Sequence, residues 1–121
     1  MLRNRKGFTL AELMVVVAVL VVLLAIAMTA YFTITERSRE ATDIENVRAA
    51  AADVVTHYLA DREVTTATVP VHQAVTGWQT DPAPQVEVDG VLYSYEAKTS
   101  GEYTVTVEVD EETGEFTLKI T

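Results

Sequence analysis

Sixteen consecutive apolar residues, 13–28, constrain the fold of this chain more than any other feature of its sequence. They lie within a longer span, residues 8–62, that contains no proline and no glycine, so nothing there forces a helix to break. A helix over that whole span would be about 80 Å long, whereas helices of globular proteins average about 11–12 residues. Such a helix needs a bilayer, a partner or a bundle to bury its faces.

The expected helix changes character along its length. Residues 8–32 are apolar on all sides, and their only polar side chains are those of Thr9, Glu12 and Thr29. This stretch is long enough to cross a bilayer. Residues 36–62 are amphipathic instead, with apolar side chains at every third or fourth position. The stripe comprises Ala41, Ile44, Val47, Ala51, Val54, Val55, Tyr58 and Leu59.

Charged residues of the amphipathic half are expected to lie off this stripe, on a solvated face. They include Glu36, Arg39, Glu40, Asp43 and Arg48. The spacing of Arg39 and Asp43 suits an attractive pair on a helix surface.

The periodicity changes after the helix. Residues 64–84 are predicted to be a connector, with one short helical turn at residues 70–76. Two apolar runs flank Asp89-Gly90, a dipeptide typical of a tight hairpin turn. Apolar and polar side chains then alternate over residues 103–109 and 116–120. The sequence therefore predicts an α+β protein, with a long N-terminal α-helix packed on a small antiparallel meander of three to four strands.

Composition excludes several classes of function. The chain has 121 residues, enough for one domain at most, and no cysteine, which excludes disulfides and thiolate metal sites. Its two histidines cannot form a three-histidine metal site. The formal net charge of −9 disfavours nucleic-acid binding, so no nucleic-acid partner is expected. Three basic residues precede the apolar block, which predicts a cytoplasmic N-terminus.

The N-terminal residues carry a specific resemblance. The run Lys6-Gly7-Phe8-Thr9-Leu10-Ala11-Glu12-Leu13-Met14, followed by the apolar block, resembles the class III signal of the type IV pilin superfamily. That superfamily includes pilins and the pseudopilins of type II secretion and competence systems. The resemblance covers residues 1–35 and implies four segments. They are a leader at 1–7, a transmembrane and filament-core helix at 8–35, its amphipathic half at 36–63, and a connector and sheet at 64–121.

The resemblance also implies roles for individual residues. A prepilin peptidase would cut between Gly7 and Phe8 and methylate the new amine of Phe8. The subunit would first be a single-pass membrane protein. An assembly platform with its ATPase would then move it into a helical filament at the cell surface, in which it contacts other copies or related subunits. The resemblance implies no enzymatic activity, no catalytic residue and no cofactor.

Glu12 is the residue that we expect to act in subunit assembly. A carboxylate within an apolar membrane helix costs about 2.5–3.5 kcal/mol on insertion scales, and such residues usually have a partner. After processing, the nearest cation is the amine of Phe8. The Phe8 amine of a neighbouring subunit is better placed to pair with Glu12 than the amine of the same chain. The alternative is that Glu12 only lies near the lipid headgroups.

Other interpretations stay open at this point. Val21 and Thr29 stand where many pilins carry a glycine and a proline, which puts a loosened helix segment in doubt. Pilin and pseudopilin are not distinguished, although we favour a pilus subunit. A different class is a soluble secreted protein that signal peptidase releases by cutting after Ala27. A third is an uncut, membrane-anchored binding domain.

Four further features are interpreted as structural. The acidic residues Asp110, Glu111, Glu112 and Glu115 lack the spacing of a calcium loop and are expected to form a solvated turn. His57 and His72 are expected to be structural or surface residues, with no metal. Trp78 is expected to fill the seam between helix and sheet.

Overall fold

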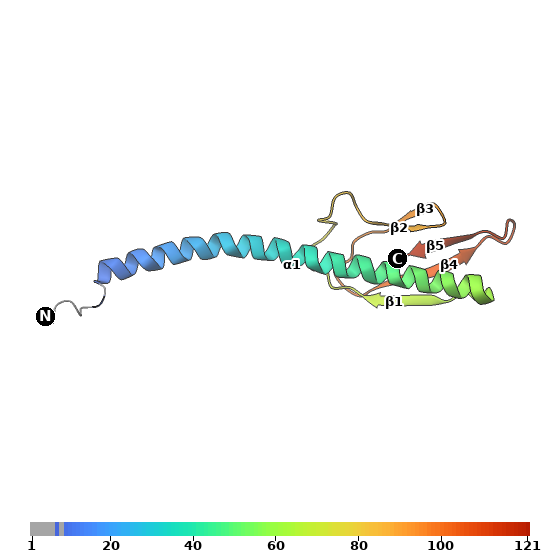
Figure 1. Ribbon diagram of the computed structural model, residues 1–121, viewed down its shortest axis with the longest axis horizontal. Helices are drawn as coiled ribbons and strands as arrows, with labels where there is room; N and C mark the ends of the chain where they lie inside the picture. The colour runs from blue at the N-terminus through green and yellow to red at the C-terminus, as the bar shows by residue number, and fades with distance from the viewer. Residues whose placement is uncertain (1–6, 8) are drawn as a thin grey trace. The chain divides into compact units, whose positions relative to one another are not determined.

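A computed structural model describes residue 7 and residues 9–121, which form one helix and five strands (Figure 1). The elements are α1 (Leu10–Asp61), β1 (Thr66–Pro70), β2 (Gln85–Val88), β3 (Val91–Ser94), β4 (Glu102–Val109) and β5 (Phe116–Ile120). The chain divides into two compact units at a boundary within α1. We call the part up to Ile34 the N-terminal unit and Thr35–Thr121 the C-terminal unit.

The long helix is confirmed to within two residues at each end. Val21 and Thr29 both lie inside α1, which is continuous through them. After the last turn, Arg62 adopts a left-handed conformation with φ of 58°, and its N–H donates to the carbonyl of Tyr58 at 2.8 Å. That conformation turns the chain toward β1.

The strands are antiparallel as expected, but the prediction of one meander is wrong. They form a three-stranded sheet in the order β1-β4-β5 and a separate two-stranded sheet of β2 and β3. β1 lies in the segment that was predicted to be a connector, and residues 70–76 form no helical turn. Its residues pair along β4, with Thr66 opposite Thr106, and this pairing is not visible in a local pattern. Pro70 ends the strand at the sheet's edge, where a missing N–H is tolerated.

The hairpin prediction is confirmed. β2 and β3 pair with Val88 opposite Val91, and the two residues between them form the turn. Asp89 and Gly90 have φ of 52° and 80°, the positive values that a type I′ turn requires.

The core of the C-terminal unit lies between α1 and the strands, as Figure 1 illustrates. Val47 and Val54 of the helix and Tyr103 and Val105 of β4 are fully buried. The alternation of residues 103–109 was predicted correctly except at its end, since Val109 is 37% exposed. The other buried apolar residues are Ala50, Ala51, Val55, Tyr58, Val86, Tyr95, Val107 and Leu118.

The predicted stripe of α1 needs correction at both ends. Ala41 is exposed, and so is Leu59. Toward the start of the C-terminal unit, the buried face continues through Glu36, Glu40 and Asp43, which were expected on the solvated face. The physical reason is that a loop covers these side chains and supplies hydrogen-bond donors to them, as described below.

Candidate functional site

The junction between Gly7 and Phe8 is the first of the predicted site positions. Gly7 is exposed, and a Cβ atom placed on it would meet nothing within 4 Å. Among the described residues, nothing close to Gly7 therefore excludes a side chain at this position. Phe8 and residues 1–6 of the leader lie outside the described residues. Cleavage before Phe8 and methylation of its amine remain predictions.

Glu12 makes a reciprocal pair of hydrogen bonds with Thr9 at the start of α1. The N–H of Glu12 donates to Thr9 Oγ1 at 3.2 Å, and the N–H of Thr9 donates to Glu12 Oε2 at 3.3 Å. This is a capping box, in which a Thr and a Glu three residues later satisfy two free helix donors. This role was not predicted from the sequence, although the Thr-x-x-Glu spacing indicates it. Glu12 therefore caps its own helix, whatever else it contacts.

The N-terminal unit exposes an apolar surface along its whole described helix. Its apolar side chains are between 43% and 75% exposed, and its most apolar window has a mean hydropathy of 3.1 with none of its residues buried. The hydroxyls of Thr29 and Thr33 donate to carbonyls one turn earlier, at 3.2 and 3.1 Å. These polar groups are therefore satisfied within the helix, as an apolar environment requires.

Residues 2–28 match the family model of the prokaryotic N-terminal methylation motif. The matched residues include the first part of the exposed apolar helix α1. The chain carries the class III signal peptide of type IV pilins and pseudopilins. A search of curated proteins and a search of solved structures gave no match.

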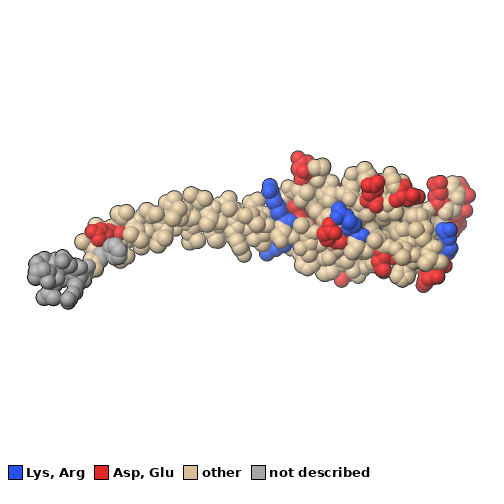
Figure 2. Space-filling view, in the orientation of Figure 1, with Lys and Arg blue, Asp and Glu red and all other residues tan. Residues whose placement is uncertain are grey.

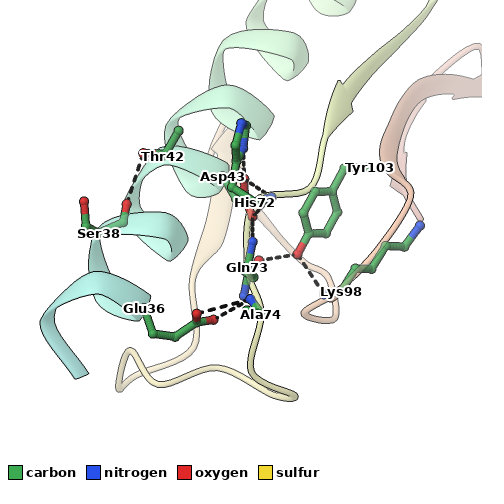
Figure 3. A network of polar contacts seen from close by, with 9 residues as sticks. All are labelled: Glu36, Ser38, Thr42, Asp43, His72, Gln73, Ala74, Lys98 and Tyr103. Carbon is green, nitrogen blue, oxygen red and sulfur yellow. Dashed lines mark hydrogen bonds and ion pairs between the residues drawn. The ribbon is translucent and has the colours of Figure 1, made fainter. Parts of the chain in front are cut away.

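The C-terminal unit contains a second polar arrangement, and Figure 3 shows the part of it that involves Glu36 and Asp43. Three carboxylates on one face of α1 hold the loop of residues 72–80, and we call this arrangement the carboxylate clasp. Glu36 is 4% exposed, and Glu40 and Asp43 are fully buried. Glu36 accepts from the N–H groups of Ala74 and Val75 at 3.0 Å.

The other two carboxylates of the clasp act in the same way. Asp43 accepts from the N–H groups of His72 and Gln73 at 2.9 and 3.0 Å. Glu40 accepts from the N–H of Gln79 and from the hydroxyl of Thr80. Backbone donors therefore stabilise buried charges that would otherwise be costly.

A layer of aromatic residues lies beside the clasp. Tyr103 donates its hydroxyl to Gln73 Oε1 at 2.6 Å and accepts from the N–H of Lys98 at 2.9 Å. Burial raises the pKa of Tyr103, and it raises the pKa of Tyr95 to about 12. Trp78 is half-buried, stacks edge-on against Tyr95 with ring centroids 5.4 Å apart, and donates to the Tyr95 carbonyl. Trp78 thus packs against the core.

The clasp is structural and was missed by the sequence analysis. Its acceptors lie on α1, and its donors are backbone N–H groups and one threonine hydroxyl 29 to 40 residues later, so no spacing within the helix reveals it. The predicted attraction between Arg39 and Asp43 is wrong. Arg39 lies 3.7 Å from Glu36 instead, because Asp43 turns toward the loop.

The remaining candidate residues take ordinary positions. His57 is exposed beside Asp53, and the ring of half-exposed His72 contacts Asp43 at 2.7 Å. The acidic turn after β4 is ordered by Asp110, whose side chain accepts from the N–H of Glu112 at 2.8 Å. Among the described residues, no three His, Cys, Asp or Glu side chains gather as a metal site.

Proposed function

We propose that this chain is a structural subunit, a pilin, of a type IV pilus or a related filament. The observation that carries the proposal is the exposed apolar surface of the N-terminal unit, whose residues 2–28 match the methylation motif. Leu10 is 75% exposed and Ile34 is 67% exposed, so the chain alone leaves this surface uncovered. Lipid covers such a surface in a membrane subunit, and the helices of other copies cover it in a filament.

The capping box suggests how Glu12 can act both in the membrane subunit and in the filament. A carboxylate has two oxygens and accepts several hydrogen bonds, so one oxygen can hold the N–H of Thr9 while the other stays available. In a filament, we propose that it pairs with the free amine of Phe8 from a neighbouring copy. Removing one partner of a buried ion pair costs on the order of 3–5 kcal/mol, which is enough to abolish assembly.

Two substitutions separate the charge of Glu12 from its capping role. Glu12→Gln keeps a capping side chain but removes the charge, whereas Thr9→Val removes the cap hydroxyl and keeps the charge. Charge pairing predicts that Glu12→Gln and Glu12→Leu are processed and inserted in the membrane but form no filaments. Thr9→Val should still assemble, because its loss is about 1 kcal/mol of helix capping.

The assay compares the subunit in sheared surface material with the subunit in whole cells that contain no wild-type copy. Normal filaments from Glu12→Gln and Glu12→Leu would exclude charge pairing. If Thr9→Val is the only variant that forms no filaments, assembly requires the helix cap and not the charge of Glu12. If the unaltered chain forms no filament, the proposed function itself is wrong. Long surface filaments indicate a pilin, and short assemblies within the envelope indicate a pseudopilin.

Processing gives an independent test. The mature chain should begin at an N-methylated Phe8, which N-terminal sequencing and mass spectrometry detect. A β-branched residue in place of Gly7 obstructs close approach of an enzyme to the backbone, so Gly7→Val should leave a precursor that retains its leader. A chain that begins at Met28 would instead indicate a secreted protein, and one that begins at Met1 an uncut anchor.

A further inference from the structure

A groove of about 240 Å³ lies in the C-terminal unit, between the β2–β3 hairpin and the start of β5. Its apolar lining is formed by Val88, Val91, Tyr93 and Phe116. Two carboxylates, those of Asp89 and Glu115, belong to exposed residues of the same lining. A groove of this kind fits a partner segment that combines a cationic head with an apolar stem, as arginine does.

The position of the groove along α1 follows from an aromatic contact. The rings of Phe116 and Tyr58 have centroids 5.3 Å apart, so the groove lies beside the last turn of the helix. Arg37 lies 21 residues before Tyr58 on the same helix. At 1.5 Å per residue, about 30 Å separate them. Arg37 and the groove are therefore at opposite ends of the C-terminal unit.

Negative charge is concentrated at the groove end. The exposed acids of the β4–β5 turn, Asp110, Glu111 and Glu112, extend the charge of the groove's own carboxylates. Figure 2 shows acidic side chains crowding the end of the C-terminal unit at which this turn lies. Two cations among the described residues lie near this end, and each contacts a residue of its own copy. Arg62 stacks on the Tyr58 ring, and Lys119 lies 3.5 Å from Glu108.

The opposite end presents arginines, and the carboxylate clasp is the reason. The acids nearest to Arg37 on the helix, Glu36 and Glu40, point inward and are satisfied by backbone donors of the loop. Arg37 forms no ion pair within the described part of the chain, and Arg39 keeps a 3.7 Å contact with Glu36 while its side chain is 46% exposed. Arginine charge is therefore available at this end.

We propose that the groove end of one copy receives Arg37 and Arg39 of a second copy in the filament. This inference rests on the proposed function, because it needs copies whose N-terminal units share one apolar core. The proposal includes that these copies point in the same direction, so that stacking along the filament brings the groove end of one toward the arginine end of the next. The contact places acids opposite arginines, and without it the mature chains, whose net charge falls from −9 to −12 when the leader with its three basic residues is removed, would repel each other.

Cysteine cross-linking tests the contact directly, because the chain contains no cysteine of its own. Filaments are prepared from the double variant Arg37→Cys with Glu115→Cys and then oxidised. A disulfide requires Cα atoms within about 7 Å, so these two positions, which lie at opposite ends of the C-terminal unit in one chain, can be joined only between copies. We expect a ladder of covalently linked subunits, and no more than dimers from either single variant.

A matched control uses Arg48→Cys with Glu115→Cys, since Arg48 is an exposed arginine on the same helix but is already paired with Glu45. An equal ladder from this control, or filaments of the first variant that show none, would overturn the contact while leaving the filament intact. Absence of filaments from the unaltered chain would overturn the proposed function and this inference with it.

Charge reversal provides a second measurement. Arg37→Glu and Glu115→Arg should each lower the yield of sheared filaments about five-fold, as expected for a weak surface pair repeated in every subunit. Their combination should restore the yield, because the pair is re-formed with opposite signs. Unchanged yields from both single variants would contradict the proposal. So would a loss that the combination does not restore, which would indicate that Arg37 binds lipid headgroups.

Discussion

Asp43 and His72 are joined through both the backbone and the side chain of the histidine. The N–H of His72 donates to Asp43 Oδ2 at 2.9 Å, and His72 Nδ1 lies 2.7 Å from Asp43 Oδ1. The carboxylate is fully buried, whereas the histidine side chain is 46% exposed. A buried carboxylate of α1 therefore holds the loop through a histidine that is itself partly exposed to solvent.

The C-terminal unit should fold without the apolar N-terminal unit. Residues 35–121 contain every residue of the core and the complete carboxylate clasp. We expect a soluble fragment of these residues to unfold cooperatively with modest stability, since a domain of this size buries a small core. Circular dichroism during urea unfolding measures it. Aggregation or the absence of strand signal would contradict the helix-on-sheet core.

Removing the Asp43 carboxylate should destabilise this fragment. Asp43→Ala leaves the buried N–H of Gln73 and the partly buried N–H of His72 without their acceptor, and loss of the acceptor of a buried N–H costs about 1–3 kcal/mol. The control is Glu45→Ala on the same helix, where an exposed acid paired with Arg48 should contribute less than about 1 kcal/mol. If both variants unfold at the same urea concentration, the clasp does not stabilise the fold.

Loss of the hydroxyl should change the free energy of unfolding differently at two buried tyrosines. Tyr103→Phe removes bonds to Gln73 and Lys98 and should cost about 1–3 kcal/mol. The Tyr95 hydroxyl has no hydrogen-bond partner among the described residues, so Tyr95→Phe should be neutral or slightly stabilising. In a spectrophotometric titration, Tyr95→Phe should also remove a group that ionises near pH 12. Equal losses of stability would show that Tyr95 has a partner.

The stability of the turn between β2 and β3 should depend on the backbone conformation of Gly90 and not on the space available for a side chain there. Gly90 has φ of 80°, and a Cβ placed there meets nothing within 4 Å. Gly90→Val should therefore cost about 1–3 kcal/mol, the range for a residue held in a disfavoured region. Gly90→Asn should cost much less, because asparagine tolerates positive φ. Urea unfolding that ranks the two variants equally would assign the loss to something other than φ.

His57 should titrate above its ordinary pKa of 6.5. The backbone carbonyl of Asp53, followed by its carboxylate, raises the pKa of His57 by favouring the protonated ring. A raised pKa in the folded state adds stability below about pH 6.5, and that stability is lost as the pH rises through the folded-state pKa. NMR titration should show that Asp53→Asn moves the pKa part of the way back and that Asp61→Asn moves it less. The reverse order would contradict this assignment.

Local pattern was sufficient for the elements whose causes are local. The long helix follows from the absence of proline and glycine between residues 8 and 62, and the hairpin follows from Asp89-Gly90, whose backbone must turn with positive φ. The prepilin signal is likewise a contiguous run. In each of these cases the residues that determine the structure are neighbours in the chain.

The tertiary structure decided what depends on distant partners. β1 forms because Thr66 and its neighbours find an open edge on β4, forty residues later, and a short Thr- and Val-containing segment does not indicate this by itself. Glu36, Glu40 and Asp43 are buried because loop amides reach them, although their charge and spacing indicate a solvated face. A carboxylate is buried only where donors replace its water, and the fold, not the helix pattern, brings those donors to it.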